Sequence, residues 1–213
     1  MAACDELESA MYARNSRGIQ EKLKGARVAV AGLGGLGSNI AVMLARIGVG
    51  RLLLVDFDNV EPSNLNRQHY GVAHIGLPKT EALQQQLDGI NPFVKIEIRT
   101  EMITAENAKE IFRDYPIVCE AFDKAQNKAM LVNALLEGGE GTCEKTIVAA
   151  SGMNGFESSN KIKTEKIFSN LYVCGDSVAP EQEGIGFMAP RVITCAGHQA
   201  NMVVRLLLGI EKE

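Results

Sequence analysis

The sequence predicts an α/β fold, with a mainly parallel sheet and helices on both faces. Short apolar runs alternate along the chain with segments whose apolar residues recur at helical spacing, and this order is typical of parallel sheets. The runs are continuously apolar rather than alternating, as expected of strands that helices cover on both sides. A chain of 213 residues, 46% of them hydrophobic, is long enough for one such domain.

The expected elements follow one another along the whole chain. Residues 5–24 are polar with helical spacing and predict a helical arm. Beyond Gly152 the pattern weakens, and the polar stretch up to Gly186 is typical of a loop apart from a weak strand signal. The expected strands are 27–31, 51–56, 94–99, 116–122, 146–150 and 171–174. The expected helices are 39–50, 79–90, 105–115, 123–137 and 191–209.

Composition excludes several classes of protein. A formal net charge of −4 argues against a nucleic-acid binder, which normally needs a basic face. No apolar run approaches the ~20 residues of a membrane span, and the acidic N-terminus is unlike a secretory signal. The five cysteines are odd in number and form no CxxC pair, which disfavours a disulfide framework or a tetrathiolate zinc site. We therefore expect a cytoplasmic protein without nucleic-acid or membrane partners.

A glycine-rich loop follows the first expected strand. Gly32, Gly34 and Gly37 match the pattern G-x-G-x-x-G, which opens a helix, and Asp56 ends the next strand. Glycines let the backbone turn tightly beside a phosphate, and an acidic residue at that strand end can accept ribose hydroxyls. The spacing alone is weak, since roughly 0.2 chance matches are expected in a chain of this composition. In context it indicates a Rossmann-like nucleotide site rather than a ligand-free turn, but NAD, FAD and ATP enzymes all share it.

Residues 56–79 favour ATP. A dehydrogenase has no evident use for a second acid, Asp58, followed by an Asn, an Arg and a Gln. Arg67 supplies a planar fork that suits phosphate oxygens, and Lys79 adds a charge at the start of a helix. Asp123 follows a strand, at the carboxyl end of the sheet where ligands bind in open α/β folds. Two cations and a carboxylate are typical of a triphosphate–Mg²⁺ site.

The chain resembles the ThiF/MoeB/HesA family of adenylating enzymes, relatives of the ubiquitin-activating enzymes. The resemblance is closest to the short, divergent ThiF type associated with thiamine biosynthesis. The matching segments are RNSRGIQ (14–20), RVAVAGLGGLGS (27–38), VDFDNVEPSNLNRQ (55–68), IGLPKTEAL (75–83), GINPFVKIE (89–97), EAFDKAQNKAML (120–131) and GHQANMVVRLLLG (197–209).

The resemblance implies roles for individual residues. Asp56 would hold the ribose of ATP, Asn64, Arg67 and Lys79 would contact the phosphates, and Asp123 would bind Mg²⁺. Arg17, the second arginine of RNSR, would reach into the site of a partner subunit, which implies a homodimer. The nucleotide-binding residues are thus expected to be Gly32, Gly34, Gly35, Gly37, Asp56, Asp58, Asn64, Arg67, Gln68 and Lys79. The catalytic residues are expected to be Arg17, Arg67, Lys79 and Asp123.

The family also implies an activity: adenylation of the C-terminal glycine carboxylate of a small ubiquitin-like sulfur carrier protein ending in Gly-Gly. A sulfur donor protein could then convert the acyl-adenylate to a thiocarboxylate. We expect a single domain over residues 1–213, with an arm (1–24), a nucleotide-binding core (25–150), and a crossover loop with the C-terminal helix (151–213). Alternatives are a molybdopterin-type carrier, a tRNA-modifying cyclase, an NAD(P)-dependent oxidoreductase or a non-catalytic dimeric scaffold.

The sequence departs from the family at its cysteines. Longer members carry two CxxC pairs that bind a structural zinc, and this chain has neither, so no zinc is expected. Some members use a cysteine of the crossover loop to form a covalent link with the carrier. Cys174 lies in that region, but the surrounding YVCGDS does not match closely enough to assign the role, and an ordinary small buried residue is the alternative.

Overall fold

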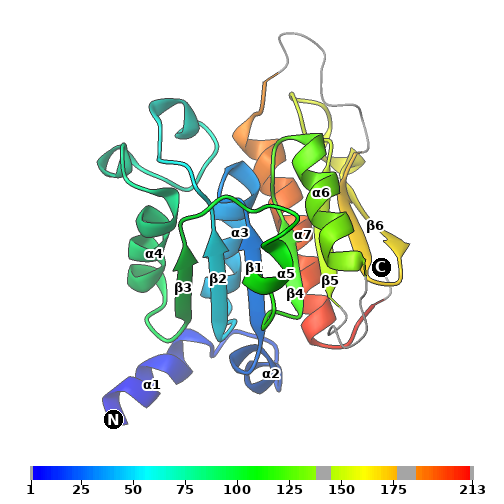
Figure 1. The fold of residues 1–213 in the computed structure, drawn as a ribbon. Coiled ribbons are helices and arrows are strands. Elements are labelled where there is room, and N and C mark those ends of the chain that lie inside the picture. The colour runs from blue at the N-terminus through cyan, green and yellow to red at the C-terminus, as the bar shows by residue number, and fades with distance from the viewer. Residues whose placement is uncertain (1, 138–144, 177–185, 212–213) are drawn as a thin grey trace.

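A sheet with strand order β3-β2-β1-β4-β5-β7-β6 forms the centre of the computed structural model, which describes residues 2–137, 145–176 and 186–211 (Figure 1). All neighbouring strands in it are parallel except β6, which pairs antiparallel with β7. The mainly parallel sheet is therefore confirmed. The strands are β1 (Arg27–Ala31), β2 (Arg51–Val55), β3 (Lys95–Arg99), β4 (Ile117–Glu120), β5 (Thr146–Ser151), β6 (Lys163–Phe168) and β7 (Leu171–Gly175).

Helices cover both faces of the sheet, as predicted. One hydrophobic core lies between the sheet and α3, α4 and α7, and the other between the sheet and α5 and α6. Along β1, Val28 and Val30 face the first core while Ala29 and Ala31 face the second, so both faces of the strand are buried. The helices are α1 (Ala2–Met11), α2 (Gln20–Lys24), α3 (Gly35–Arg46), α4 (Lys79–Ile90), α5 (Ala108–Ile111), α6 (Ala125–Leu136) and α7 (Ala189–Leu207), with 3₁₀ turns η1 (Pro62–Asn64), η2 (Val72–His74) and η3 (Ser159–Lys161).

The strand register brings three loops to the same edge of the sheet. Ala31, the last residue of β1, lies beside Val55 of β2 and beside Glu120 of β4. The segments that follow these residues therefore leave the sheet at one level, with β1 in the middle. This carboxyl edge lies at the top of Figure 1, where the loops that carry η1 and η2 also lie. Polar groups on these loops can therefore face a common ligand.

The region after β5 differs from the expected loop. Residues 163–168 form β6, an edge strand whose side chains are almost all exposed. An edge strand that buries few side chains has no apolar run, which is why the sequence pattern predicted a loop there. Residues 151–213 therefore contribute two strands as well as the C-terminal helix, and residues 177–185 of the expected crossover loop lie outside the described residues.

Other boundaries also differ from expectation. The helix expected at 39–50 is α3 (Gly35–Arg46), which begins within the glycine loop, and the strand expected at 116–122 ends at Glu120. The helical arm is divided into α1 and α2, and both helices lie at the amino ends of the strands, at the bottom of Figure 1. The helix expected at 105–115 is a single turn, α5, which packs on the sheet through Ile111 and the following Phe112. In the described parts of the chain, no helix is both long and apolar enough to cross a membrane.

Candidate functional site

The glycine loop begins at the end of β1 and continues into the first turn of α3. Gly32 has φ = 89°, a backbone conformation that side chains other than glycine rarely adopt. A Cβ at Gly32 would lie 3.0 Å from the carbonyl oxygen of Ala121, and a Cβ at Gly37 would clash with the backbone oxygen of Gly32. Glycine is therefore required at both places. The first N–H groups of α3, which have no carbonyl partner within a helix, remain available at its N-terminus.

Asp56 shapes the loop from the neighbouring strand. Its Oδ2 accepts the N–H of Leu33 at 2.6 Å and its Oδ1 accepts the N–H of Asp58 at 2.8 Å. The side chain is buried, and burial raises the pKa of this carboxyl above its ordinary value, while Lys79 opposes the rise. The acid predicted to bind the ribose therefore also fixes the backbone of the glycine loop.

Lys79 is buried at the start of α4, directly beside Asp58. Its Nζ lies 2.8 Å from Oδ2 of Asp58, and its N–H donates to the carbonyl oxygen of Asp58 at 2.9 Å. Only 8% of the lysine side chain is exposed, against 49% of the aspartate side chain. The helix start thus presents one ammonium group at the carboxyl edge, with Asp58 as its partner.

The segment SNLNRQ lies across the first turn of α3. The Cγ of Arg67 is 3.3 Å from the position a Cβ would take on Gly35, and its guanidinium lies 5.5 Å from the centre of the Phe187 ring. Asn64 holds its own turn, because its Oδ1 accepts the N–H of Glu61 at 3.1 Å. Arg67 is therefore placed next to the glycine loop, whereas Asn64 also has a local capping role.

Gln68 has an unused hydrogen-bond acceptor, its side-chain oxygen, beside the glycine loop. Its side chain is buried, and within the described residues its Oε1 has no hydrogen-bond donor. Its Nε2 lies 3.9 Å from the position a Cβ would take on Gly34, so the amide is beside the glycine loop. A buried amide oxygen without a donor is costly, and a ligand hydroxyl or amino group would satisfy it.

Three buried residues that the sequence analysis did not assign connect this segment to the glycine loop. Ser38 Oγ accepts the N–H of His69 at 2.9 Å and donates to the carbonyl oxygen of Gly34. Asn39 Nδ2 donates to the carbonyl oxygens of Gly35 (2.6 Å) and Arg67 (3.1 Å). Tyr70 Oη donates to the carbonyl oxygen of Leu33 at 2.9 Å. Polar residues inside an apolar helical segment were the only sequence signal for Ser38 and Asn39.

Asp123 completes the edge on the other side of β1. It lies in the connection between β4 and α6, with its side chain exposed. The described residues give it neither a hydrogen bond nor an ion pair. The preceding Phe122 packs on the glycine loop, with its Cδ1 3.0 Å from the position a Cβ would take on Gly32. The fold therefore brings together the predicted glycine loop, Asp56, Asp58, Arg67, Gln68, Lys79 and Asp123.

Comparison with known proteins identifies the family of this chain. Residues 8–213 match the sequence model of the ThiF family. The chain belongs to the ThiF family. Among curated relatives of this ThiF-family chain, the sulfur carrier protein adenylyltransferase of Thermus thermophilus is 41% identical over 54% of this chain and 43% of its own length. The adenylyltransferase and sulfurtransferase UBA4 of Candida glabrata is 33% identical over 90% of this chain and 44% of its own length.

Solved structures share the fold of this ThiF-family chain. The E. coli tRNA N6-threonylcarbamoyladenosine dehydratase TcdA, in complex with ATP, superposes with a TM-score of 0.85 at 20% identity, over 98% of this chain and 96% of that protein. The E. coli MccB structure with ATP gives a TM-score of 0.69 at 22% identity, over 92% of this chain and 59% of the other. The chain spans less than half the length of the curated relatives named above.

The residues of this ThiF-family site fit a nucleoside triphosphate. The N-terminus of α3 offers N–H groups and the positive end of its dipole, and Arg67 and Lys79 add two cations. Mg²⁺ in such sites is usually held by one or two carboxylates together with substrate phosphates and water. The exposed Asp123 fits that requirement, although no three potential ligands of the types His, Cys, Asp or Glu cluster in the part of the chain that the structure describes.

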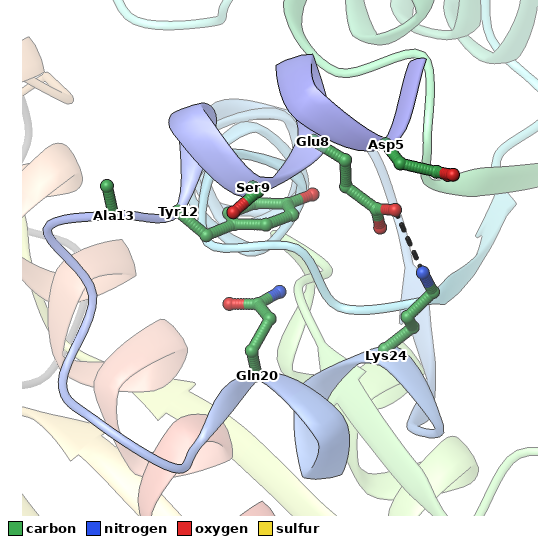
Figure 2. Close-up of a pocket in the computed structure, with 7 residues that line it drawn as sticks. All are labelled: Asp5, Glu8, Ser9, Tyr12, Ala13, Gln20 and Lys24. Atoms are coloured by element: carbon green, nitrogen blue, oxygen red, sulfur yellow. Dashed lines mark hydrogen bonds and ion pairs between the residues drawn. The ribbon is translucent and has the colours of Figure 1, made fainter. Parts of the chain in front are cut away.

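Arg17 lies away from these residues, in the arm of this ThiF-family chain. Asn15, two residues earlier in the chain, donates to the carbonyl oxygen of Ile47, immediately after α3 ends. The glycine loop lies at the other end of α3, whose 12 residues span about 18 Å. A cavity of about 380 Å³ lies in the arm, between α1 and α2 (Figure 2), at the end of the sheet opposite to the glycine loop (Figure 1). Its lining residues are Asp5, Glu8, Ser9, Tyr12, Ala13, Gln20 and Lys24.

Cys174 is fully buried near the end of β7. Its Sγ lies 3.4 Å from Oγ1 of Thr164, which is itself 3.1 Å from Nδ1 of His198. Cys119 and Cys195 lie in the same core, and burial raises the pKa of both thiols, that of Cys195 to about 12. A buried thiol is not presented to a protein partner, so the geometry favours the core role over a covalent link. Cys143 lies outside the described residues.

Proposed function

We propose that this ThiF-family chain uses ATP to adenylate the C-terminal glycine carboxylate of a small ubiquitin-like sulfur carrier protein. The observation that carries the proposal is the gathering of Arg67, Lys79 and Asp123 around the N-terminus of α3. This arrangement suits a triphosphate with its divalent cation better than the two phosphates of NAD. The relative in Thermus thermophilus, named a sulfur carrier protein adenylyltransferase, supports a carrier as the substrate.

The proposed reaction is an in-line displacement at phosphorus. A carboxylate oxygen of the carrier attacks the α-phosphorus of ATP, and the bond from that phosphorus to the bridging oxygen of the β-phosphate breaks. Pyrophosphate leaves with the electron pair, and the acyl-adenylate remains. Lys79 and Arg67 would neutralise the charge that develops on the phosphates, while Asp56 and Gln68 would orient the nucleoside. Mg²⁺ held at Asp123 would neutralise further phosphate charge when bound.

Arg17 would serve the site of a second copy of the chain. Its place beyond the far end of α3 separates it from the glycine loop of its own chain. An arginine fork suits phosphate oxygens, and exchange of arms in a homodimer would give each site one arginine from the partner subunit. The proposed assembly is therefore a homodimer with two composite sites.

The proposed carrier is a ThiS-like protein of thiamine biosynthesis, whose acyl-adenylate a sulfur donor would convert to a thiocarboxylate. A molybdopterin-type carrier is the alternative substrate. The two ubiquitin-like carriers present the same Gly-Gly carboxylate, so the site around the phosphates would treat them alike. Contacts with the body of the carrier would decide between them.

ATP–pyrophosphate exchange tests the proposal. We expect a ThiS-type carrier with a Gly-Gly end to stimulate exchange of labelled pyrophosphate into ATP, and a carrier that lacks the last glycine to give none. Lys79→Ala and Asp123→Ala should each lower the rate by ~10²–10³-fold, the usual cost of removing one preorganised charged group. Lys166 lies on β6 and forms an exposed ion pair with Glu211. The variant Lys166→Met removes this pair and should leave the rate unchanged. Absence of exchange with every carrier, with wild type equal to Asp123→Ala, would contradict the proposal.

Thermal-shift titration separates this function from the oxidoreductase alternative. A ligand that binds only the folded protein raises its melting temperature, and at a given concentration a tighter ligand raises it more. We expect ATP with Mg²⁺ to stabilise the wild-type protein and NAD to have no effect. Stabilisation by NAD without stabilisation by ATP would favour the oxidoreductase.

A further inference from the structure

A buried ion pair lies beneath the loop that carries Asp123. Glu120 ends β4 and is fully buried, and both of its carboxylate oxygens lie 3.1 Å from Nζ of Lys128 on α6. The lysine side chain is 22% exposed. Buried charges are expensive to desolvate, and apolar residues of similar size often give equal or greater stability. Stability alone therefore does not explain why this place in the core holds a carboxylate and an ammonium.

The contacts of Glu120 fix the backbone that follows it. Its Oε1 accepts the N–H of Phe122 at 2.7 Å, which turns the chain directly after the strand. On the other side, the carbonyl oxygen of Ala121 and the ring of Phe122 both lie 3.0 Å from the position a Cβ would take on Gly32. The two residues before Asp123 are thus held between the carboxylate and the glycine loop.

Lys128 fixes the other end of the same connection. It lies in the first turn of α6, so its contacts with Glu120 join the start of that helix to the end of β4. Asp123 lies between the two fixed ends. Because its own side chain makes no hydrogen bond or ion pair with any described residue, its place depends on these neighbours.

We propose that Glu120 and Lys128 form a positioning pair: their ion pair fixes residues 121–124 and so holds the Asp123 carboxylate beside the glycine loop for the divalent cation of bound ATP. This inference rests on the proposed function, in which Asp123 holds Mg²⁺. Neither residue touches the substrate in this role. Each acts through the backbone that it anchors.

The first test compares Lys128→Met, Lys128→Arg and the control Lys166→Met. Met keeps most of the length of lysine and removes its charge, whereas Arg keeps the charge. For Lys128→Met we expect a tenfold or greater rise in the Mg²⁺ concentration that half-saturates ATP–pyrophosphate exchange, and a roughly 100-fold loss of kcat, since a small misplacement can cost that much. The KM for ATP at saturating Mg²⁺ should change little. Lys128→Arg should recover most of the activity, and Lys166→Met should match wild type.

A second readout does not depend on activity. Hydrogen exchange of the protein without ATP should be faster in Lys128→Met at the amides of residues 121–124, and unchanged at the amides of β1, β2 and α3. A purely structural role would instead speed exchange throughout the core. Unchanged exchange at 121–124, together with an unchanged Mg²⁺ requirement, would overturn the proposal.

The double variant Glu120→Gln/Lys128→Met separates positioning from stability. It removes both charges, so its free energy of unfolding should recover relative to Lys128→Met. If the pair positions Asp123, the raised Mg²⁺ requirement persists. If the pair is only structural, activity returns with stability and the proposal is wrong.

Asp123→Ala is measured in parallel. If Asp123→Ala matches wild type, the proposed function itself is wrong. If Asp123→Ala loses activity while Lys128→Met keeps the wild-type Mg²⁺ requirement, only the positioning pair is wrong.

Discussion

Tyr70 is buried between the glycine loop and the start of α4. Its hydroxyl lies 2.9 Å from the carbonyl oxygen of Leu33 and 3.5 Å from that of Lys79. Burial raises the pKa of this phenol, so it stays protonated and can donate. The residue makes no covalent or charged contribution to the proposed reaction. It joins the loop that would hold phosphates to the helix that presents the lysine.

Tyr70→Phe tests this role. Removing the hydroxyl leaves a buried carbonyl without its donor, which should cost about 1–2 kcal/mol of the free energy of unfolding. The loosened loop should bind ATP roughly 3–10-fold more weakly, as measured by calorimetry. Tyr115→Phe is the matched control, because its hydroxyl donates to Glu97 at 2.7 Å on the other face of the sheet. It should lose stability without losing affinity for ATP, and equal loss of affinity in both variants would contradict the prediction.

The stability of Lys128→Met should depend on pH. Burial raises the pKa of Glu120 above its ordinary value of 4.5, and Lys128 opposes the rise. A carboxyl with a raised folded-state pKa contributes stability that is present below 4.5 and is lost as the pH rises through the folded-state value. Removing the lysine raises that pKa further and enlarges the loss. The variant should therefore lose about 3–5 kcal/mol at pH 8 and clearly less at pH 5. Urea denaturation checks this, and an equal loss at both pH values would count against it.

At the scale of the elements, the start of α3 is tightly packed. A Cβ at Gly37 would clash with the backbone of Gly32, while one at Gly35 would lie 2.8 Å from Cγ1 of Val192 at the start of α7. The backbone at the start of α3 therefore packs directly against the backbone of the glycine loop and against a side chain of α7. Small changes in this place move the N-terminus that would bind phosphate.

Gly37→Ala tests the packing of that helix start. We expect loss of ATP binding and a large loss of stability, because backbone rather than a flexible side chain meets the added methyl. Gly197→Ala in α7 is the matched control: a Cβ there meets nothing within 4 Å, so it should stabilise the protein by roughly 0.5–1 kcal/mol. Thermal denaturation and ATP titration measure both. Wild-type ATP affinity in Gly37→Ala would refute the packing argument.

The elements differ in how well local sequence predicts them. Helix α4 (Lys79–Ile90) and strand β1 (Arg27–Ala31) have the predicted bounds, because each contains a complete periodic or apolar pattern. Strand β6 was missed, because it is an exposed edge strand. The helix expected at 105–115 is only the turn α5, although Ala108, Ile111, Phe112 and Tyr115 are buried at helical spacing. Apolar spacing there marked which side chains are buried and not the length of the helix.

At the scale of the whole molecule, the candidate site and the arm lie at opposite ends of the sheet. The carboxyl edge gathers the candidate nucleotide site, and the amino edge holds the arm with Arg17. If each arm serves a partner subunit, a single chain has no complete site. The activity of the proposed homodimer then belongs to the pair of chains rather than to one.

Mixing two inactive variants tests this arrangement. Arg17→Ala and Asp123→Ala should each be inactive alone. In a mixed dimer, one site keeps both Asp123 and the arginine of its partner, so statistical exchange should restore about a quarter of the wild-type sites. The measurement is ATP–pyrophosphate exchange after mixing and subunit exchange. Activity no higher than the sum of the separate variants would show that Arg17 does not act in a neighbouring subunit.

Much of the candidate site was predictable, because its residues follow recognisable elements. The glycine loop and Asp56 come directly after strands, Lys79 begins a helix, and Asp123 lies in the short connection after β4. Parallel strands bring such connections to one edge. The supporting residues were not predictable in this way. Ser38, Asn39 and Tyr70 contact partners far along the chain, and no local pattern marks them. Lys128 contacts the nearby Glu120, but only the burial of that carboxylate shows that the contact is an ion pair in the core.

The sequence by itself determined the α/β class, the glycine loop and the resemblance to the ThiF family, because periodicity, glycine spacing and charge are local properties of the chain. Only the tertiary structure decided that Asp56 fixes the glycine loop, that Gln68 has an unused buried acceptor, and that Glu120 and Lys128 form an ion pair. The physical reason is that burial and hydrogen bonding depend on which distant segments meet, and strand register sets those meetings.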